Sequence, residues 1–588
     1  MAITTLQQQI VDFKGRLVVN APPGSGKTYT LVSKIDKVKR ESNKKIIALT
    51  FSNKAAEELT NRISNQENVE IGTIHAFCQD IVMTRGYQIG LPEGLNIINS
   101  DLDKIFIIEQ VLNELPFLKK PVSNNKLENI LKFIKEQKQK FIGPEEILKS
   151  NDQYGKIKYE IYQGYNNKML SQRLLDFDDL LYYAYMILSL KDNREIYQQM
   201  YGHLYVDEAQ DLNYSQYQII KLLASIIPDV MLIGDPEQSI YRFMGSNKKY
   251  MMEDFVRDFG AEMMFLSENF RSAKKIVNLI NVLSDTNESL ANYPIEGEVT
   301  YTQYQNEDEE ALAIVEKIEE LLANGLQHNE IAILGRNTYL FNSIIEKFHE
   351  KNIPFNMGLQ TGIQMESQVG EILLAFIKLS SNPFNERLRN FFKDNLCLEN
   401  NHIETIEKGM QEKFLTIYNI VNSANSHVFT FGKEIESYIN EVILHKEMDD
   451  MCKYLVVGDL KIIKENWDNF LKRSKTTNPS LNTFINELNM GKTKNFDLDG
   501  ISLLTIHKSK GLGFDTTFVI GLNEGTLPDY RAIESSELIE EKNNVYVALS
   551  RAKRRCYISS VRVKMMPWGK YKEQKESRYV EKIKEAIS

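Results

Sequence analysis

One short loop near the start of the chain limits the possible folds more than any other stretch. Residues 16 to 20 read as a buried strand, residues 29 to 39 read as a helix, and between them lies Ala21-Pro-Pro-Gly-Ser-Gly-Lys27-Thr28. A strand, a glycine-containing loop and a helix in this order are typical of a phosphate-binding loop, in which N–H groups at a helix N-terminus approach phosphate oxygens. The pattern favours an α/β fold with a parallel sheet.

Within this loop, Lys27 would bring a positive charge to the β and γ phosphates, and the Thr28 hydroxyl would bind Mg²⁺. Ala21 stands where the strict pattern has glycine. A loop that only turns the chain is the alternative, which the flanking strand and helix disfavour. The residues expected to surround the nucleotide phosphates are Ala21, Pro22, Pro23, Gly24, Ser25, Gly26, Lys27 and Thr28.

Two later strands end in acids or amides, as one edge of a nucleotide site requires. The strand before Asp207 and Glu208 is short and apolar, and the strand Val230 to Ile233 is followed closely by Gln238. We predict that Asp207 holds Mg²⁺ through water and that Glu208 takes the proton from an attacking water. The Gln238 amide is placed to sense the γ-phosphate.

Composition excludes several classes of protein. The length of 588 residues and the hydrophobic fraction of 42% allow several cores, about four domains at the usual size. No apolar run is long enough for a membrane span, and the first residues do not resemble a signal peptide, so we expect a cytoplasmic protein without membrane contact. The cysteines, Cys78, Cys397, Cys452 and Cys556, stand singly, which favours reduced thiols. With a net charge of -9, any nucleic acid must follow a local basic groove.

Two stretches have helical periodicity and few motifs. The first, from about 80 to 171, contains a lysine strip from Lys132 to Lys140, which we interpret as a solvated helix face rather than a phosphate contact. In the second, from about 360 to 495, Trp467 and the run from Lys472 to Lys475 are better explained as a packed aromatic beside a solvated loop than as a duplex contact.

Beyond these local patterns, eleven short blocks follow one another along the chain. They are Gln7 with Ile10 and Val11, APPGSGKT, TFSNKAAEEL, GTIHAF, DFDDL, VDEAQD, GDPEQSIYRFMGS, LSENFRS, Gly335-Arg336-Asn337, the stretch from Leu504 to Leu512, and the stretch from Asn544 to Ala552. Single blocks are weak signals, but these blocks in this order are jointly specific. With them the chain resembles, over nearly its whole length, the superfamily 1 DNA helicases of the UvrD, Rep and PcrA type.

The resemblance implies an α/β fold of two RecA-like domains with parallel sheets, each interrupted by a mainly helical insertion. The expected segments are 1–79 and 172–265 for the first RecA-like domain, 80–171 for its insertion, 266–358 and 496–588 for the second RecA-like domain, and 359–495 for its insertion.

The resemblance also implies roles for single residues. Arg271 and Arg551 would be arginine fingers on the γ-phosphate, Phe270 would stack on adenine opposite Gln7, and Gly511 would belong to the nucleotide site. For Arg551 the alternative is a solvated helix end, because residues 551 to 555 are basic. The residues expected along the DNA strand are Phe51, Asn53, His75, Tyr241, Phe243, Arg336 and His507. Tyr241 and Phe243 offer flat faces on which bases can stack.

The sequence departs from the family pattern at two positions. The family usually has glutamate where this chain has Gly513, and that glutamate meets the ribose, so we predict weaker discrimination between ATP and other nucleoside triphosphates. Phe243 replaces the more usual tryptophan and offers less stacking area.

Taken together, these features predict an ATP- and Mg²⁺-dependent helicase that moves 3′ to 5′ on single-stranded DNA and at junctions with duplex, in DNA repair, recombination or defence. The alternative is a DNA-stimulated ATPase that serves as motor or sensor for a separate nuclease in an antiphage complex. A nucleotide-gated binding module without motor activity is disfavoured, because both acids and both arginines are present.

Overall fold

The chain forms two compact units, each built from separate parts of the sequence. The computed structural model describes residues 3–64, 66–115, 122–149, 154–285, 288–357, 368–382, 384–390, 459, 462–463, 465–472, 480–491, 500–533, 537–565 and 571–587. The first unit comprises residues 1–74, 191–359 and 496–588, and the second comprises residues 75–190 and 360–495. The first unit contains two six-stranded parallel sheets, so the predicted α/β fold with two RecA-like domains is confirmed.

In the first sheet, the strand order places the phosphate loop beside the two acidic strand ends. The order is β3-β2-β6-β7-β1-β8, and all neighbours run parallel. The strands are β1 (Arg16–Asn20), β2 (Lys45–Thr50), β3 (Val69–Thr73), β6 (Tyr201–Val206), β7 (Asp229–Gly234) and β8 (Glu262–Phe265). Because parallel strands end at one edge, the residues after β1, β6 and β7 meet there.

The first sheet is accompanied by amphipathic helices whose apolar sides enter its core. They are α1 (Thr5–Asp12), α2 (Lys27–Glu41), α3 (Asn53–Arg62), α10 (Lys191–Met200), α11 (Tyr214–Ala224) and α12 (Phe255–Phe259). Buried side chains from α2, such as Leu31 and Ile35, join Val19 and Ile233 of the sheet in one core. The predicted strand at residues 16 to 20 is confirmed, and the predicted helix begins two residues earlier, at Lys27.

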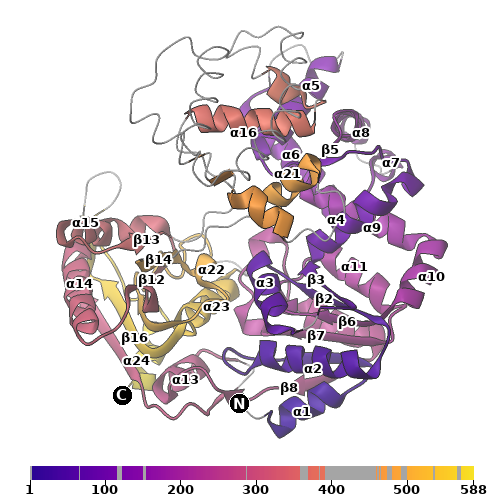
Figure 1. Ribbon diagram of the computed structural model, residues 1–588. Coiled ribbons are helices and arrows are strands. Elements are labelled where there is room, and N and C mark those ends of the chain that lie inside the picture. Colours follow the sequence, from indigo (N-terminus) through magenta and orange to yellow (C-terminus); the bar gives the residue numbers. More distant parts are fainter. Residues whose placement is uncertain are drawn as a thin grey trace, which may run out of the picture. The chain divides into compact units, whose positions relative to one another are not determined.

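The second sheet interleaves strands from two distant parts of the chain, as the pink and yellow arrows of Figure 1 show. Its order is β11-β16-β15-β12-β14-β13, again entirely parallel. The strands are β11 (Glu298–Tyr304), β12 (Ile331–Gly335), β13 (Phe355–Asn356), β14 (Ile501–Thr505), β15 (Phe514–Val519) and β16 (Ala552–Val561). Its helices are α13 (Lys274–Asn281), α14 (Glu307–Ala323), α15 (Asn342–Lys351), α22 (Ile506–Ser509), α23 (Leu538–Leu549) and α24 (Val580–Ile587).

The stretch around Arg551 is not a solvated helix end. Helix α23 ends at Leu549, Arg551 is only 1% exposed, and the basic residues that follow belong to strand β16. The alternative interpretation of this basic cluster is therefore wrong, because the chain turns directly from a buried helix into a buried strand.

The second unit is mainly helical in its described part. Its helices are α4 (Ile74–Arg85), α5 (Asp101–Glu114), α6 (Asn124–Gln139), α7 (Pro144–Lys149), α8 (Gly155–Ser171), α9 (Phe177–Ser189), α16 (Gln368–Ser381) and α21 (Leu481–Asn489), with a short pair of strands, β4 (Asn96–Ile97) and β5 (Leu174–Leu175). Trp467 is buried against Phe470 and Phe484, so its prediction as a packed aromatic is confirmed. Residues 473 to 475 of the adjacent basic run lie outside the described residues.

The boundaries of the helical segment differ from the expected residues 80 and 171. Strand β5 pairs with β4, and Lys138 of α6 forms ion pairs with Asp176 and Asp179 at the start of α9. These contacts tie residues 172 to 190 to the helices before them. Lys138 is also 1% exposed, so the interpretation of the lysine strip as wholly solvated is wrong at this position.

Two further expectations have simple outcomes. Cys78 and Cys556 are buried free thiols, whereas Cys397 and Cys452 lie outside the described residues. In the described ranges, no helix combines the length and the apolar run needed to cross a membrane.

Candidate nucleotide site and nucleic-acid interface

The phosphate loop joins β1 to α2 and depends on glycine at two positions. Gly24 and Gly26 have φ angles of 77° and 79°, in the left-handed region that disfavours side chains. A Cβ at Gly24 would lie 2.5 Å from Asn269 Oδ1, and one at Gly26 would lie 2.7 Å from Gln7 Nε2. Ala21 needs no such freedom: it is fully buried, and its N–H donates to the Gly234 carbonyl at 2.8 Å. Alanine therefore fits where the strict pattern has glycine.

Two segments far apart in sequence contact the outside of this loop. Gln7, in α1, donates from Nε2 to the Ser25 carbonyl at 3.2 Å. The Phe270 N–H donates to the Gly24 carbonyl at 2.8 Å. The structure thus brings Gln7 and Phe270 to the same loop, and their contact with adenine stays a prediction. Asn269, which the sequence did not single out, closes the contact by donating to the Pro23 carbonyl at 2.8 Å.

The two acids after β6 face the loop lysine. Lys27 Nζ lies 2.5 Å from Glu208 Oε1 and 3.9 Å from Asp207 Oδ1. Burial raises the pKa of Asp207 to about 6, and the positive charge of Lys27 opposes this. Burial also opposes ionisation of Glu208, but the charges of Lys27 and Lys510 outweigh it and lower its pKa to about 2. Glu208 is therefore the ionised partner of Lys27.

Gln238 connects the first sheet to the arginines of the second. Its amide Nε2 donates to Asp235 Oδ2 at 2.8 Å, and its Oε1 accepts from Arg551 Nη2 at 3.1 Å. Tyr546 of α23 donates to the same Asp235 carboxylate at 3.2 Å. The sequence analysis assigned no role to Asp235 or Tyr546. The signal that could have identified Asp235 is its position as an acid directly after β7.

Both predicted arginine fingers reach this region with donors to spare. Arg551 Nη1 donates to the Leu512 carbonyl at 3.0 Å, and Arg271 Nη2 donates to the Ser550 carbonyl at 2.7 Å. Arg271 Nε is buried without a hydrogen-bond partner among the described residues. Burial lowers the pKa of both guanidinium groups, and the charge of Arg271 helps to lower that of Arg551 to about 9. Two cations that destabilise each other form a site suited to an anion.

Lys510 is a residue of this site that the sequence analysis did not assign. Its Nζ donates to Asp211 Oδ2 and to the Gln238 carbonyl, and it lies 5.0 Å from the centre of the Tyr241 ring. The following Gly511 has a φ of 80°, which lets the chain turn towards Leu512. Lys510 therefore touches both the nucleotide side and the aromatic side of the unit.

Four of the residues predicted to contact DNA form an aromatic cluster: Phe51, Tyr241, Phe243 and His507. Phe51 and Tyr241 stack with centroids 5.0 Å apart and planes 19° apart. The edge of His507 meets Phe243 at 5.6 Å, and Phe243 is 72% exposed. Burial lowers the pKa of His507 to about 4, so this ring is neutral at physiological pH. An exposed aromatic face beside neutral rings suits base stacking better than phosphate binding.

The other predicted contacts lie elsewhere. Asn53 is the first residue of α3, directly after the Ser52 cap. His75 belongs to the second unit, where its ring meets Phe177 edge to face at 5.5 Å. It lies in α4, because β3 already ends at Thr73.

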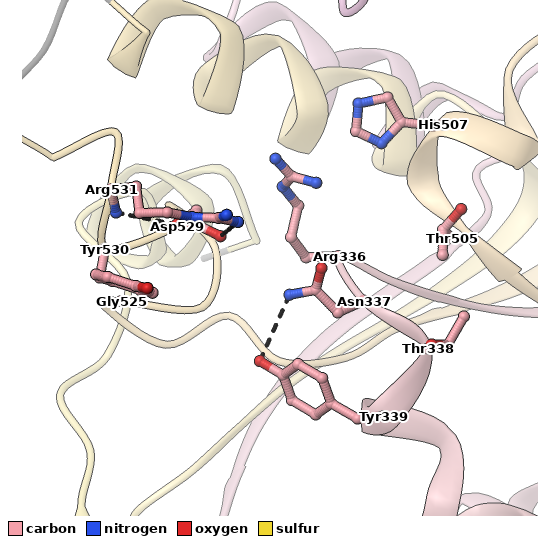
Figure 2. A pocket seen from close by; sticks show the side chains of 10 residues that line it. All are labelled: Arg336, Asn337, Thr338, Tyr339, Thr505, His507, Gly525, Asp529, Tyr530 and Arg531. Atoms are coloured by element: carbon pink, nitrogen blue, oxygen red, sulfur yellow. Dashed lines mark hydrogen bonds and ion pairs between the residues drawn. The ribbon is translucent and has the colours of Figure 1, made fainter. Parts of the chain in front are cut away.

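Arg336 lines a pocket of about 510 Å³ at the ends of β12 and β14, which we call the Arg336 pocket. Figure 2 shows Arg336 and Asn337 between the turn around Asp529 and the pair Thr505 and His507. The full lining is Arg336, Asn337, Thr338, Tyr339, Thr505, His507, Gly525, Asp529, Tyr530 and Arg531. His507 belongs both to this pocket and to the aromatic cluster, so the two adjoin at this residue.

Two RecA-like domains, a phosphate loop and a pair of buried arginines define a P-loop nucleotide-binding protein of the two-domain motor class. The chain belongs to the UvrD/REP helicase family. The UvrD/REP helicase N-terminal domain matches residues 3–259, and the UvrD-like helicase C-terminal domain matches residues 264–447 and 433–563. The predicted family is therefore confirmed.

Curated relatives match almost the whole chain. The ATP-dependent DNA helicase PcrA of Bacillus subtilis (strain 168) is 27% identical over 98% of this chain and 85% of its own length. A probable DNA helicase II homolog of Mycoplasma capricolum is 29% identical over 94% of this chain and 83% of its own length. The PcrA helicase of Staphylococcus aureus (strain Mu50) is 27% identical over 99% of this chain and 86% of its own length. The chain is thus a UvrD/PcrA-like ATP-dependent DNA helicase.

Proposed function

We propose that this chain couples ATP hydrolysis to 3′ to 5′ movement along single-stranded DNA and to strand separation at junctions with duplex. The observation that supports this most directly is the chain of contacts through Gln238. Its side chain bonds Arg551, its carbonyl accepts from Lys510, and Lys510 faces the Tyr241 ring. A change at the γ-phosphate position therefore has a short physical route to the aromatic cluster.

In the hydrolysis step, the residues of the first sheet hold the phosphates and activate water. Lys27 leaves Glu208 for the β and γ phosphates, which frees the Glu208 carboxylate to take a proton from water. Arg271 and Arg551 then stabilise the negative charge that develops at the γ-phosphate. Arg271 Nε, for which the described part of the chain provides no hydrogen-bond partner, is a donor available for this purpose.

Mg²⁺ fits the residues that the sequence assigned to it. Thr28 offers a hydroxyl and Asp207 a carboxylate, and both are hard oxygen ligands of the kind that Mg²⁺ takes alongside its own waters. When bound, the ion neutralises charge between the β and γ phosphates. Thr28 and Asp207 would hold it, while Lys27 remains a separate point charge.

Movement follows from closure between the two RecA-like domains. Arg271 and Arg551 belong to the second domain, whereas Lys27, Glu208 and Gln238 belong to the first. Engagement of the γ-phosphate draws these groups together, and release of phosphate lets them separate. The aromatic cluster contains rings from both domains, so closure moves the stacking faces relative to each other. A step of about one nucleotide per cycle is the expectation that the family resemblance gives for such a stacking track.

Membership of the helicase family does not specify the cellular pathway. We place the activity in DNA repair, recombination or defence. The relatives named above are helicases and none is described as a nuclease subunit, so a self-sufficient motor is the function we propose.

The experiment is strand separation by the purified chain with ATP and Mg²⁺ at one fixed salt concentration, because phosphate contacts depend steeply on salt. Three duplexes are compared, with a 3′ tail, a 5′ tail or no tail, and Lys27→Ala serves as the inactive control. Unwinding from the 3′ tail alone supports the proposal. Hydrolysis that depends on DNA without any strand separation would instead show that the motor needs a partner.

A further inference from the structure

The Arg336 pocket is held open by a carboxylate that does not line it. Glu541, in the first turns of α23, has a side chain only 3% exposed. Its Oε1 accepts from Arg336 Nη2 at 2.9 Å and from Nε at 3.1 Å. Its Oε2 accepts from the Asp529 N–H at 2.9 Å. One buried carboxylate therefore binds the two walls of the pocket at once.

These bonds leave part of the Arg336 guanidinium for a ligand. In the described part of the chain, Nε and Nη2 bond Glu541, and no partner is found for Nη1. A guanidinium held on one edge and open on the other is pre-organised to bind a phosphate, because little side-chain freedom remains to be lost. On the opposite wall, Arg531 is held by both oxygens of Asp529.

The same helix carries contacts to the nucleotide side. Asn543 donates to the Ser239 carbonyl at 3.0 Å, and Tyr546 donates to Asp235 at 3.2 Å. Helix α23 ends at Leu549, two residues before Arg551. Because a helix of this length moves as a rigid rod, a shift at Arg551 or Tyr546 is carried to Glu541.

We propose that Glu541 is a positioning residue for DNA binding: it fixes Arg336 and the Asp529 turn so that the Arg336 pocket grips one phosphate of the strand. The inference rests on the proposed function, since it takes single-stranded DNA as the ligand. Glu541 does not touch the DNA in this arrangement and acts through Arg336.

The direction in which Glu541→Gln changes DNA affinity distinguishes a positioning role from a simple electrostatic effect of the Glu541 charge. If Glu541 were only a negative charge near the strand, Glu541→Gln would strengthen binding of an anionic polymer. As a positioning residue, it weakens binding, because a neutral amide no longer holds the guanidinium fork. We expect the Kd for single-stranded DNA to rise about tenfold, the factor for one hydrogen bond to a charged group.

The test measures fluorescence anisotropy of a labelled oligonucleotide at fixed salt for the full chain and four variants. These are Glu541→Gln, Arg336→Ala, the double variant, and Glu581→Gln as a control on the exposed face of α24. If Glu541 acts through Arg336, the double variant binds no more weakly than Arg336→Ala. The thermal midpoint of every variant is measured as well, because removing one partner of a buried ion pair lowers stability, and binding is compared at a temperature at which all variants are folded.

The outcomes distinguish the two proposals. Unchanged or tighter binding by folded Glu541→Gln, or additive losses in the double variant, would each overturn the role of Glu541. Failure of the unchanged chain to bind single-stranded DNA would overturn the proposed function itself.

Discussion

The ion pair between Lys27 and Glu208 shows how single residues of the site depend on one another. Each is charged and largely removed from water, so each would be costly without its partner. A bound triphosphate supplies a competing anion for Lys27. Substitutions of these two residues can therefore distinguish nucleotide binding from ATP turnover.

We expect Lys27→Ala and Glu208→Gln to abolish ATP turnover for different reasons. Without Lys27, the site loses the charge that holds the β and γ phosphates, so nucleotide binding also weakens. Glu208→Gln keeps a side chain of the same shape beside Lys27 but cannot take a proton, so nucleotide binding persists. Steady-state hydrolysis and equilibrium binding of a labelled nucleotide check both statements. Retained hydrolysis in either variant would show that the site is assigned wrongly.

Gly513 allows a direct test of sugar recognition. A Cβ at this position would lie 3.5 Å from Lys553 Cε and 3.8 Å from Arg271 Cδ, which are ordinary contacts, so a side chain fits. We expect Gly513→Glu to lower the Km for ATP and to increase the preference for ATP over dATP, because it adds an acceptor for a ribose hydroxyl. Gly513→Gln is the control for size without charge. An unchanged Km and sugar preference would contradict the prediction.

At the scale of elements, α6 and α9 of the second unit are joined by buried charges. Lys138 lies 2.9 Å from Asp176 and 2.7 Å from Asp179, and Tyr165 donates to Asp176 at 3.2 Å. Asp176 also caps α9 by accepting from the Asp179 N–H. A helix start and an ion pair thus share the same carboxylates, so the orientation of α9 against α6 is fixed where α9 begins.

The raised pKa of Asp178, which lies beside this cluster, predicts that the free energy of unfolding depends on pH. Burial and the charge of Asp176 raise the pKa of Asp178 to about 6, above the value of about 3.9 in an unfolded chain. The folded protein therefore binds this proton more tightly, so the contribution to stability is complete below pH 4 and is lost as pH rises through 6. Asp178→Asn should raise the free energy of unfolding by up to about 3 kcal/mol at pH 8 and change it little at pH 4.

Urea denaturation followed by circular dichroism at both pH values checks this prediction. Asp192→Asn, at an exposed position of α10, controls for the loss of a negative charge. An equal change at both pH values would mean that Asp178 titrates normally in the folded protein.

At the scale of the whole first unit, Lys510 bridges the two RecA-like domains. Burial raises the pKa of Asp211 to about 6 and Lys510 opposes this, so the pair is mutually dependent. The same ammonium group faces Tyr241 and bonds the Gln238 carbonyl. Loss of the Lys510 ammonium group removes this direct contact between the Gln238 backbone and the Tyr241 ring and leaves both of those side chains in place.

We therefore expect Lys510→Met to lower about tenfold the ratio of ATP hydrolysis with DNA to ATP hydrolysis without it. Hydrolysis is measured with and without single-stranded DNA at saturating ATP. Lys572→Met, at an exposed strand position, is the matched control. Full stimulation in Lys510→Met would show that the two sites communicate by another route.

Much of the fold and of the nucleotide site could be predicted because its signals are local. The strand at residues 16 to 20, the glycine loop and the acids after β6 are short segments whose own residue order sets their conformation. The family pattern grouped Phe51, Tyr241, Phe243 and His507 as DNA contacts, and the structure brings their rings together, but their contact with DNA stays a prediction. Boundaries within the helical segment were less predictable, because β5 pairs with β4 rather than with the large sheet.

By itself, the sequence determined which segments form strands and helices, where the phosphate loop lies and which acids follow the sheet. Only the tertiary structure decided the partners of the charges. Lys138 is buried between two aspartates, Lys510 bonds Asp211 across 299 positions, and Glu541 holds Arg336 across 205. A lysine or glutamate on a helix has the same local pattern whether solvated or buried. Its role depends on whether packing removes water and brings an opposite charge within bonding distance.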